Sequence, residues 1–433
     1  MSARFTRRRF LQTTAVATAG LWTLPLRASQ DKTQPSEKLT VGVIGIAGQG
    51  AYNWGELTRC PVQIAALCDV HESRDQVIAA RKRFPEAKFY TDFRHLIEHK
   101  GLDAVLVATP DHMHVHPTLT ALRAGLHVYC EKPLTHTVQE ARTVIETAAA
   151  QKRVTQMGTQ IHAGGNYRRV VELIQGGAIG PVGEVHVWVG KVHAGRKLKG
   201  ETPPIPAGLH WDLWQGPVPE RPYHPQYVPF HWRGYWAYGG GTLADMACHY
   251  MDLPFWALKL RHPETVVAEG PPVDPDCCPP WTVVRYTFPA REELPPVRLT
   301  WYDGERRPPQ FAEGKLPQWG DGVLFVGEKG MLLADYGRRM LVPEQQFKDV
   351  PPPKPMIPNS IGHHREWVEA CKHGGTTTCN FNYSGALSEA VLLGTVAYRC
   401  GKPLTWDAKN LKAVGTPEAE QFLRKEYRKG WEL

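Results

Sequence analysis

The sequence predicts an α/β fold, in which an N-terminal doubly wound parallel sheet is followed by a C-terminal α+β domain with a mostly antiparallel, open sheet. Three observations lead to this prediction. Short apolar runs alternate with helix-like stretches up to about residue 160. A glycine cluster follows the first apolar run. Beyond residue 160, apolar and polar residues alternate within single runs, which is typical of half-exposed antiparallel strands.

Five apolar runs predict the parallel strands. They are short and several are rich in β-branched residues, as expected for strands buried on both faces. Longer, mixed stretches between them predict the crossover helices. The predicted strands are 39–45, 63–68, 104–108, 127–130 and 154–157, and the predicted helices follow the glycines and cover 74–84, 117–124 and 138–150.

The second half of the chain contains strand-like runs, helices and a hairpin that turns at Glu328-Lys329-Gly330. Strands are predicted at 183–190, 282–288, 298–302 and on both sides of the turn within 324–335, and helices at 241–258, 363–371 and 384–399. The predicted boundaries are 1–30 for a signal peptide, 31–38 for a linker, 39–160 and 161–410 for the two domains, and 411–433 for a C-terminal tail.

The N-terminus has the features of an export signal. Residues 6–11, Thr-Arg-Arg-Arg-Phe-Leu, fit the twin-arginine pattern, and an uncharged, mildly apolar stretch follows as far as Leu26. That stretch is too short and too weakly apolar for stable membrane insertion. A basic N-terminus without a targeting role is the alternative. The pattern favours export to the periplasm by the twin-arginine route, which carries folded proteins, so an exported cofactor would have to be held tightly.

Composition excludes several classes of protein. Five arginines and no acidic residue fall in residues 1–30, so the formal charge of +8 falls to about +3 without them. No basic block remains that would indicate a nucleic-acid partner. The nine cysteines are scattered, odd in number and without a CxxC pair, which favours reduced core residues over a zinc site or a disulfide framework.

The glycine cluster lies where a dinucleotide fold requires one. Residues 45–50, Gly-Ile-Ala-Gly-Gln-Gly, stand between the first predicted strand and the helix after it. Small residues there let the backbone approach a pyrophosphate, and the helix N-terminus favours the negative charge. The match to G-x-G-x-x-G is imperfect, because Ala47 stands where the second glycine belongs. By itself the cluster also fits an ordinary strand–helix turn.

Asp69 strengthens the dinucleotide interpretation. It closes the second predicted strand 24 residues after Gly45, near the spacing expected for a carboxylate that binds the ribose hydroxyls. An acid there also repels a 2′-phosphate, so NAD is favoured and NADP stays open as an alternative. A solvated loop aspartate is the simpler explanation of Asp69 alone. Both features within one β/α series predict an NAD(P)-binding Rossmann domain over 39–160.

Two further segments carry a family resemblance. The first is the run 108–114, Ala-Thr-Pro-Asp-His-Met-His, followed by Glu131-Lys132-Pro133. The second is the glycine run 239–241, followed by Asp245 and His249 in a Gly-Gly-x-x-x-Asp-x-x-x-His pattern. Together, over about residues 39–410, they resemble the Gfo/Idh/MocA family, which includes glucose–fructose oxidoreductase and inositol dehydrogenase. The resemblance implies an NAD(P)-dependent oxidoreductase, and the family's second-domain sheet favours a homo-oligomer.

The resemblance also implies which residues surround the cofactor. Thr109, Pro110 and His114 are expected on the nicotinamide side, and Glu131 and Lys132 beside it at the carboxyl end of a strand, with a cis Lys132–Pro133 bond. The full candidate set for cofactor binding is Gly45, Ala47, Gly48, Gln49, Gly50, Asp69, Arg74, Thr109, Pro110, His112, His114, Glu131, Lys132 and Gln160.

The candidate catalytic residues are Lys132, Asp245 and His249. Oxidation of a secondary alcohol requires loss of a hydride and loss of the hydroxyl proton, and a group that titrates near neutrality suits the proton. His249 is the candidate base, and Asp245, four residues before it on a predicted helix, is expected to orient the imidazole. Lys132 is expected to hydrogen-bond the reacting oxygen and stabilise a developing alkoxide. A lone Asp-x-x-x-His on a helix is usually structural.

Aromatic and polar side chains predict a carbohydrate or cyclitol site after residue 160. Segments 211–214 and 227–236 are dense in tryptophan and tyrosine, which stack on sugar C–H surfaces, although an arm that packs on the domain is the alternative. No metal site is predicted, because the spacing of His112, His114 and His116 alone is weak evidence for zinc. The candidate substrate residues are His162, Tyr167, Trp232, Arg233, Asp245 and His249.

Three functions remain open from the sequence. The first is hydride transfer between a tightly held nicotinamide and a sugar, cyclitol or sugar derivative. The second is an NAD-dependent glycosidase that acts by transient oxidation and elimination. Such glycosidases carry a His-Gly-Leu-Gly-Pro type segment after the glycine run, where this chain has Cys-His-Tyr-Met-Asp at 248–252. The third is a cofactor-binding scaffold without activity, which the candidate catalytic residues disfavour.

Overall fold

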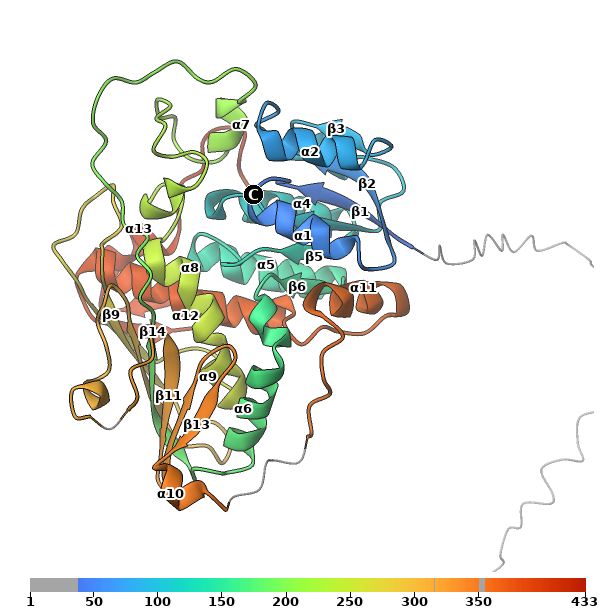
Figure 1. Cartoon of the computed structure of the whole chain (residues 1–433). Helices are drawn as coiled ribbons and strands as arrows, with labels where there is room; N and C mark the ends of the chain where they lie inside the picture. The colour runs from blue at the N-terminus through green and yellow to red at the C-terminus, as the bar shows by residue number, and fades with distance from the viewer. Residues whose placement is uncertain (1–37, 315, 350–354) are drawn as a thin grey trace, which may run out of the picture. The chain divides into compact units, whose positions relative to one another are not determined.

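The N-terminal parallel sheet contains six strands in the order β3-β2-β1-β4-β5-β6 (Figure 1). The computed structural model describes residues 38–314, 316–349 and 355–433, so the predicted signal and nearly all of the predicted linker lie outside the described residues. The strands are β1 Leu39–Ile44, β2 Val62–Cys68, β3 Lys88–Tyr90, β4 Ala104–Val107, β5 His127–Cys130 and β6 Thr155–Met157. The crossover helices are α1 Gln49–Leu57, α2 Asp75–Arg83, α3 Phe93–Ile97, α4 Val115–Arg123 and α5 Val138–Gln151.

The strand order reverses at β1, which has β2 on one side and β4 on the other. The chain therefore leaves the carboxyl ends of these two strands in opposite directions and opens a crevice between them, where doubly wound sheets bind ligands. All four residues of β4 are fully buried, as their apolar sequence predicts. This confirms the predicted Rossmann sheet. The strand β3 was absent from the prediction because its three residues are too few to show a period.

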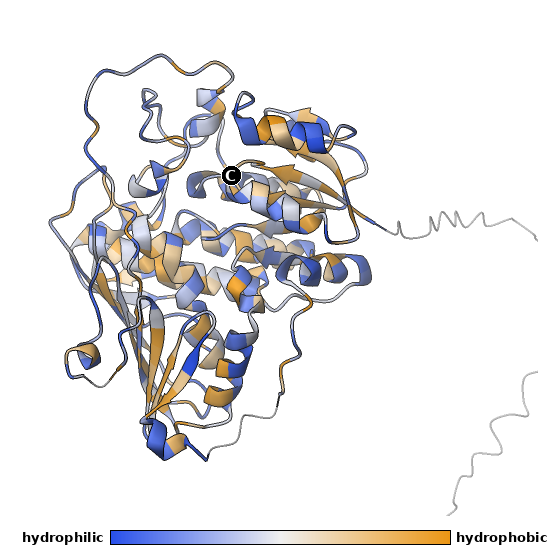
Figure 2. Cartoon of the chain, in the orientation of Figure 1, coloured by the Kyte–Doolittle hydropathy of each residue, from blue (hydrophilic) through white to orange (hydrophobic). Residues whose placement is uncertain are grey.

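The second sheet has nine strands in the order β13-β12-β11-β7-β10-β9-β8-β14-β15. Its neighbours pair antiparallel except for β7 and β10, which run parallel. This confirms the mostly antiparallel sheet. Hydrophobic residues follow the strands of both sheets in Figure 2. The strands are β7 Val182–Trp188, β8 Thr265–Glu269, β9 Val283–Phe288, β10 Val297–Tyr302, β11 Gly322–Gly327, β12 Gly330–Ala334, β13 Arg339–Val342, β14 Leu404–Asp407 and β15 Lys412–Val414.

A long helix packs against the nine-stranded sheet and also contacts a helix of the parallel sheet. The helix α12 (Phe381–Cys400) packs on α5 and α8 as well as on β8. None of the described helices is both long and apolar enough to cross a membrane. The remaining helices are α6 Gly165–Gln175, α7 Trp211–Gln215, α8 Gly241–Tyr250, α9 Asp252–Ala257, α10 Glu344–Phe347, α11 His363–His373 and α13 Glu420–Leu423.

Three predicted segments differ from the structure. The single helix predicted over 241–258 is two helices, because Pro254 has no N–H to donate to the carbonyl of Tyr250, where α8 ends. The helix α11 belongs to the apolar cluster of the Rossmann domain through Trp367 and Val368, although its residues lie inside the range predicted for the second domain. The predicted tail contributes β15 to the nine-stranded sheet.

Candidate active site

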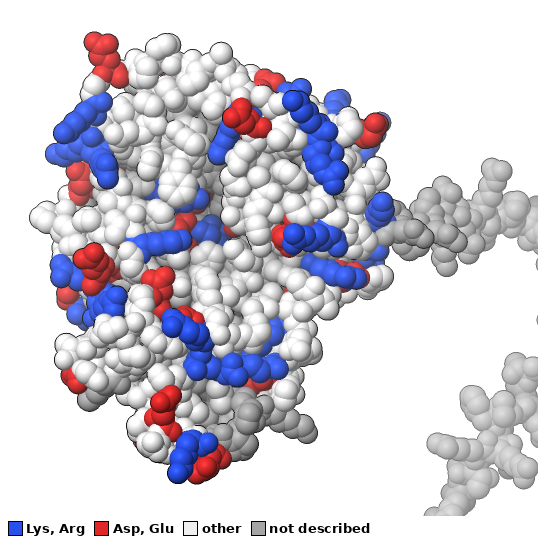
Figure 3. All heavy atoms as spheres, in the orientation of Figure 1, with Lys and Arg blue, Asp and Glu red and all other residues white. Residues whose placement is uncertain are grey.

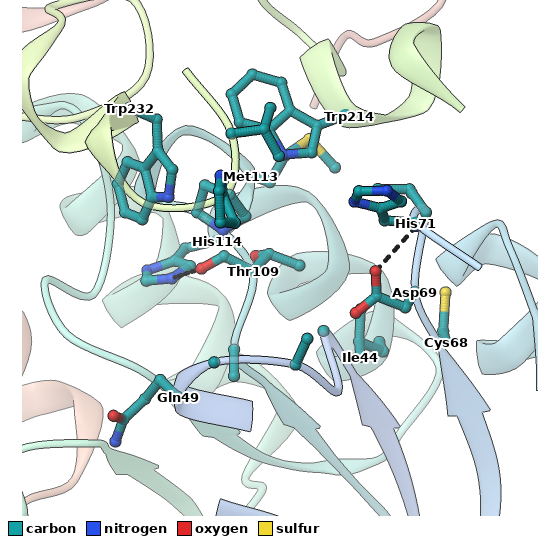
Figure 4. A pocket seen from close by; sticks show the side chains of 18 of the residues that line it. Ile44, Gln49, Cys68, Asp69, His71, Thr109, Met113, His114, Trp214 and Trp232 are labelled. Atoms are coloured by element: carbon teal, nitrogen blue, oxygen red, sulfur yellow. Dashed lines mark hydrogen bonds between the residues drawn. The ribbon is translucent and has the colours of Figure 1, made fainter. Parts of the chain in front are cut away.

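A cavity of about 370 Å³ opens at the crevice between β1 and β4. One wall comes from the carboxyl ends of the parallel strands, and the other from residues 213–233 together with Trp431. Figure 3 shows a hollow on this face with basic and acidic side chains at its floor. In Figure 4, Asp69 and His71 lie on one side of the cavity, and His114 and Trp232 on the other. The predicted cofactor residues on its wall are Gly45, Ala47, Gly48, Gln49, Asp69, Arg74, Thr109, Pro110, His114, Glu131 and Lys132.

The glycine loop is shaped by close backbone contacts. Gly45 has a φ of +79°, and a Cβ there would lie 2.6 Å from the carbonyl oxygen of Ala108. Gly50 does not line the cavity. It lies beneath the loop, where a Cβ would overlap the carbonyl oxygen of Gly45. Glycine at these two positions lets α1 begin directly at the cavity, with its positive N-terminus available to a phosphate.

Asp69 closes β2 and faces the glycine loop. Its carboxylate accepts hydrogen bonds from the backbone N–H groups of Ile46 and His71, both at 3.0 Å. Burial raises the pKa of Asp69, and these two bonds partly oppose the rise. Each carboxylate oxygen can accept more than one hydrogen bond, so Asp69 can also receive ribose hydroxyls. Arg74, on the same side, supplies a positive charge near Asp69 and Gly48.

Glu131 lies at the floor of the cavity, at the end of β5. Its Oε1 accepts hydrogen bonds from Asn53 Nδ2 at 2.9 Å and Gln49 Nε2 at 3.2 Å. Burial raises the pKa of Glu131, while these bonds and the neighbouring Lys132 act to lower it. The Glu131 carboxylate therefore links two side chains of α1 to the end of β5.

Lys132 of the N-terminal domain forms an ion pair with Asp245 of the C-terminal domain. The Lys132 Nζ lies 2.8 Å from Asp245 Oδ1 and 2.9 Å from the Asp245 carbonyl oxygen, and the Lys132–Pro133 bond is cis. Asp245 also pairs with Arg233 Nε and His193 Nε2, each at 3.1 Å. Burial opposes ionisation of both partners, but their attraction outweighs it. The pKa of Lys132 lies above its usual value, and that of Asp245 well below.

His114 is held by two carbonyl groups on the nicotinamide side. Its Nδ1 lies 2.7 Å from the Pro133 oxygen, and its Nε2 lies 2.8 Å from the Thr109 oxygen. Burial lowers the pKa of His114 to about 4, and the two carbonyls oppose that effect. A neutral imidazole has one N–H, so His114 donates to one of these two carbonyl oxygens at a time and through that bond fastens the turn after β4.

The predicted pairing of Asp245 with His249 is wrong. The Asp245 carboxylate faces Lys132 and Arg233, which offer charge-assisted bonds that a buried neutral imidazole does not, and it also accepts from His193. His249 is buried and does not line the cavity, and its Nδ1 has no hydrogen-bond partner among the described residues. Burial, with a further contribution from the charge of Lys132, lowers the pKa of His249 to about 3.

Asp245 itself is absent from the cavity wall, as are four other predicted residues. His112 is fully buried, with its Nε2 2.8 Å from the Trp214 carbonyl oxygen, because it packs under the aromatic arm. Gln160 begins a 3-10 turn and is also absent from the wall. The Tyr167 hydroxyl donates to the His249 carbonyl oxygen at 3.2 Å. None of these three residues lines the cavity, and their contacts with a cofactor or substrate stay predictions.

His162, the fourth, belongs to a separate buried cluster. Its Nδ1 lies 2.9 Å from both oxygens of Asp252, and its ring stacks on Trp256 with centroids 4.0 Å apart. Cys379 lies close enough to complete a group of potential metal ligands. The hydrogen bond between His162 and Asp252 accounts for their approach. The nine cysteines are all free, and six of them are buried.

The candidate set lacks several wall residues, among them Asp111 and Trp431, while Trp214 falls in the predicted aromatic segment 211–214. Trp214 and Trp431 cover the opening, and no local pattern marks Trp431 as part of a site 300 residues upstream in the chain. Asp111 lines the cavity from the turn after β4. An acid directly after Thr109-Pro110, at the same sheet edge as Asp69 and Lys132, was the available signal.

Comparison with known proteins identifies the family. Residues 39–159 match the oxidoreductase family with an NAD-binding Rossmann fold, GFO_IDH_MocA, and residues 182–294 match its C-terminal α/β domain. The two matches together span more than half of the chain, which belongs to the Gfo/Idh/MocA oxidoreductase family.

Individual relatives agree with this assignment. An inositol 2-dehydrogenase of Salmonella typhimurium is 32% identical over 151 residues, which is 34% of this chain and 45% of that protein. A glycosyl hydrolase family 109 protein of Shewanella is 25% identical over 199 residues, 40% of this chain and 43% of that protein. The chain thus matches less than half the length of these relatives.

A solved structure extends the likeness to both domains. The scyllo-inositol dehydrogenase from Lactobacillus casei, with bound NAD(H) and scyllo-inositol, superposes with a TM-score of 0.58. The alignment covers 85% of this chain and 98% of that one at 16% sequence identity, which shows a shared fold.

Proposed function

We propose that this protein transfers a hydride between a tightly held NAD and a secondary alcohol or ketone of a sugar, cyclitol or sugar derivative. The observation that carries the proposal is the junction of Lys132 and Asp245 at one end of a cavity whose other end is formed by the glycine loop and Asp69. The tight backbone cradle at Gly45 fits a pyrophosphate. When bound, the nicotinamide accepts or returns the hydride.

The residues of the chain then have distinct tasks. The N-terminus of α1 binds the pyrophosphate, and Asp69 receives ribose hydroxyls. Lys132, kept charged by Asp245, donates a hydrogen bond to the reacting oxygen and stabilises the negative charge that develops there. The indole of Trp232 and the guanidinium of Arg233 line the same end and offer a stacking face and donors to a hydroxylated ring.

Tight retention of NAD is supported by a strap, residues 206–214, that crosses the turn after β2. The backbone N–H of Glu72 donates to Gly208, and that of His210 donates to Val70, both at 2.8 Å. The Ser73 hydroxyl donates to the Ala207 carbonyl at 2.7 Å. These contacts fasten the strap to the loop that carries Asp69 and Arg74, the residues that would hold the adenosine end of the cofactor.

The C-terminus closes the same opening from the other side. Trp431 lines the cavity, and its carbonyl oxygen lies 2.7 Å from His116 Nε2. Arg428 joins this end to the strap through Asp212, with Nη1 to Oδ1 at 2.5 Å, and its backbone N–H donates to Pro217. A cofactor in the cavity would leave only after one of these segments separates.

Removal of the link between strap and C-terminus is expected to speed NAD release. Arg428→Ala breaks the ion pair with the exposed Asp212, which is worth about 1 kcal/mol or less, so the release rate should rise up to about fivefold. Release is measured by dilution of the NAD-loaded protein and filtration over time. Lys402→Ala, which breaks an exposed pair with Glu418 elsewhere, is the matched control. Equal rates for both variants would contradict the strap.

The function itself is tested in two steps. Denaturation of the purified protein followed by mass spectrometry is expected to release NAD in near-stoichiometric amount. Addition of myo-inositol, D-glucose and other sugars to the NAD-loaded protein is then expected to raise absorbance at the band of the reduced cofactor for at least one compound. A protein that binds no nicotinamide after incubation with NAD or NADP would refute the proposal.

A second candidate function is glycoside cleavage by transient oxidation, favoured by the likeness to the glycosyl hydrolase family 109 protein. Oxidation of one sugar carbon would acidify the neighbouring C–H bond, elimination would expel the aglycone, water would add to the resulting double bond, and the hydride would return to the ketone. Net redox change separates the two functions. A p-nitrophenyl glycoside that releases nitrophenol without net reduction of NAD would favour the glycosidase.

Export by the twin-arginine route and assembly as a homo-oligomer complete the proposal. The arginine pattern at residues 6–11 supports export, and a retained cofactor suits a compartment without a free nicotinamide pool. Cell fractionation of a tagged full-length chain tests the route. A variant in which Arg7 and Arg8 are replaced by lysine is the control. Light scattering of the purified protein tests the oligomeric state.

A further inference from the structure

Tyr336 is an aromatic residue that is packed at its polar tip and yet 37% exposed. It lies in the turn between β12 and β13, and its ring stacks on Tyr250 of α8 with the centroids 4.6 Å apart. The ring of Tyr167 from α6 meets it edge-on at 5.9 Å. Burial, and then the neighbouring Tyr250 and Asp321, raise the pKa of the Tyr336 hydroxyl well above its usual value. The hydroxyl therefore faces the protein, and part of the apolar ring is left to solvent.

The turn that carries Tyr336 is fixed by several contacts. The Asp335 Oδ1 accepts the backbone N–H of Arg338 at 2.7 Å, and the Arg338 guanidinium lies 4.0 Å above the ring of Trp319. Asn166 of α6 donates to the carbonyl oxygens of Asp335 and Arg338, both at 2.8 Å. A side chain that is already ordered loses little conformational entropy when a ligand stacks on it. Tyr336 is thus a preformed stacking surface.

This surface continues the face of α8 that begins at the reacting end of the cavity. Asp245 and His249 lie one helical turn apart on α8, and Asp245 pairs with Lys132 at 2.8 Å. The ring of Tyr336 lies 6.4 Å from that of His249 at an interplanar angle of 62°. Asp245 and His249 are each 9% exposed, whereas Tyr336 is 37% exposed. The face therefore leads from a deep end at Lys132 to the surface at Tyr336.

Lys191 adds a donor near the surface end of this face. It is exposed and follows β7, one residue after Gly190, whose backbone N–H donates to Asp321 Oδ1 at 2.8 Å. Two residues further on, His193 pairs with Asp245 at 3.1 Å. The positive charge of Lys191 also acts on His249, whose pKa it helps to lower. An ammonium group is therefore available to a polar molecule that extends along α8.

We propose that Tyr336 forms a subsite for a second sugar ring, so that the substrate is a disaccharide or another glycoside. The proposal rests on the proposed hydride-transfer function and names its substrate class. The ring that is oxidised lies at Lys132, beside Trp232 and Arg233. The ring joined to it lies nearer the surface, where its C–H face stacks on Tyr336 and its hydroxyls accept from Lys191.

The position of Tyr336 along α8 favours a second ring over a further contact with the first. Lys132 is bound at Asp245, whereas Tyr336 stacks on Tyr250, five residues later in the same helix. Five residues advance an α-helix by about 7.5 Å, which is more than the width of one six-membered ring. The stacking face beside Lys132 is already supplied by Trp232, which is 5% exposed and lines the cavity.

The first test compares the binding of matched sugar pairs to the NAD-loaded full-length protein by titration calorimetry. The pairs are cellobiose with methyl β-D-glucoside, maltose with methyl α-D-glucoside, lactose with methyl β-D-galactoside and melibiose with methyl α-D-galactoside. Within a pair the first ring and its anomeric configuration are the same, and only the second ring differs. At least one disaccharide should bind about 5- to 10-fold more tightly than its methyl glycoside. A panel in which no disaccharide has this advantage would overturn the proposal.

The second test assigns the advantage to Tyr336. Tyr336→Ala should weaken binding of the disaccharide to the level of its methyl glycoside and leave binding of the methyl glycoside unchanged. Tyr336→Phe should keep the advantage, because stacking needs the ring and not the hydroxyl. Val414→Ala, which shortens an exposed apolar side chain in β15, should behave as wild type. Equal losses for both members of a pair would place Tyr336 against the first ring and refute the subsite.

Turnover separates the subsite from the proposed function. Tyr336→Ala should raise the KM for the disaccharide about 5- to 10-fold and leave kcat unchanged, because the subsite binds the ring that does not react. A binding advantage that depends on Tyr336 without any reduction of NAD would refute hydride transfer and leave the subsite standing. Reduction of NAD by the methyl glycosides without a gain from the second ring would refute the subsite alone.

Discussion

Replacement of Lys132 with alanine is expected to lower the rate of hydride transfer by about 10³-fold while NAD remains bound. The substitution removes the ammonium group that lies 2.8 Å from Asp245 and faces the reacting end of the cavity. The NAD cradle at Gly45 and Asp69 does not involve this side chain. Single-turnover reduction of bound NAD measures the rate, and denaturing release of NAD measures occupancy.

Stability provides the control for this variant. Loss of one partner from a buried ion pair typically costs about 3–5 kcal/mol, but Arg233 and His193 still face Asp245, so the loss should lie below that range. Lys259→Ala breaks only an exposed pair with Glu292 and should change neither rate nor melting temperature. Unchanged turnover in a folded Lys132→Ala protein would contradict the placement of the chemistry at this end of the cavity.

Gly50→Ala should abolish NAD binding and lower the free energy of unfolding by about 1–3 kcal/mol or more. An alanine Cβ would overlap the carbonyl oxygen of Gly45, so α1 must move away from β1 and the pyrophosphate cradle must open. NAD occupancy after incubation and chemical unfolding measure the two effects.

Gly55→Ala is the matched control in the same helix. A Cβ at Gly55 meets no atom within 4 Å, so this variant should keep NAD and gain about 0.5–1 kcal/mol from the higher helix propensity of alanine. Similar behaviour of the two variants would show that the close approach at Gly50 does not hold the loop.

Local sequence was sufficient for much of the fold. The apolar runs of β1, β4 and β5 predict buried parallel strands, because a strand covered on both faces cannot tolerate polar side chains. The glycine loop and Asp69 were placed at the cavity because both follow strand ends, and parallel strands end at one edge. Short elements such as β3 lacked enough residues to show a period.

Pairing between distant side chains needed the tertiary structure. The i, i+4 spacing brings Asp245 and His249 to one helix face, but the carboxylate is directed to Lys132, more than 100 residues away in the sequence. Burial of His162 with Asp252 likewise depends on how the 3-10 turn Gln160–Ala163 lies against α9, and no spacing encodes it.

The sequence by itself determined the alternation of strands and helices in the parallel sheet, the dinucleotide loop and the presence of a lysine at the end of β5. These features depend on local periodicity and on backbone geometry within a few residues. Tertiary structure alone decided which charges meet and that Trp431 and the strap border the cavity. The physical reason is that hydrogen bonds and ion pairs form between whichever groups packing brings within about 3 Å, regardless of their separation along the chain.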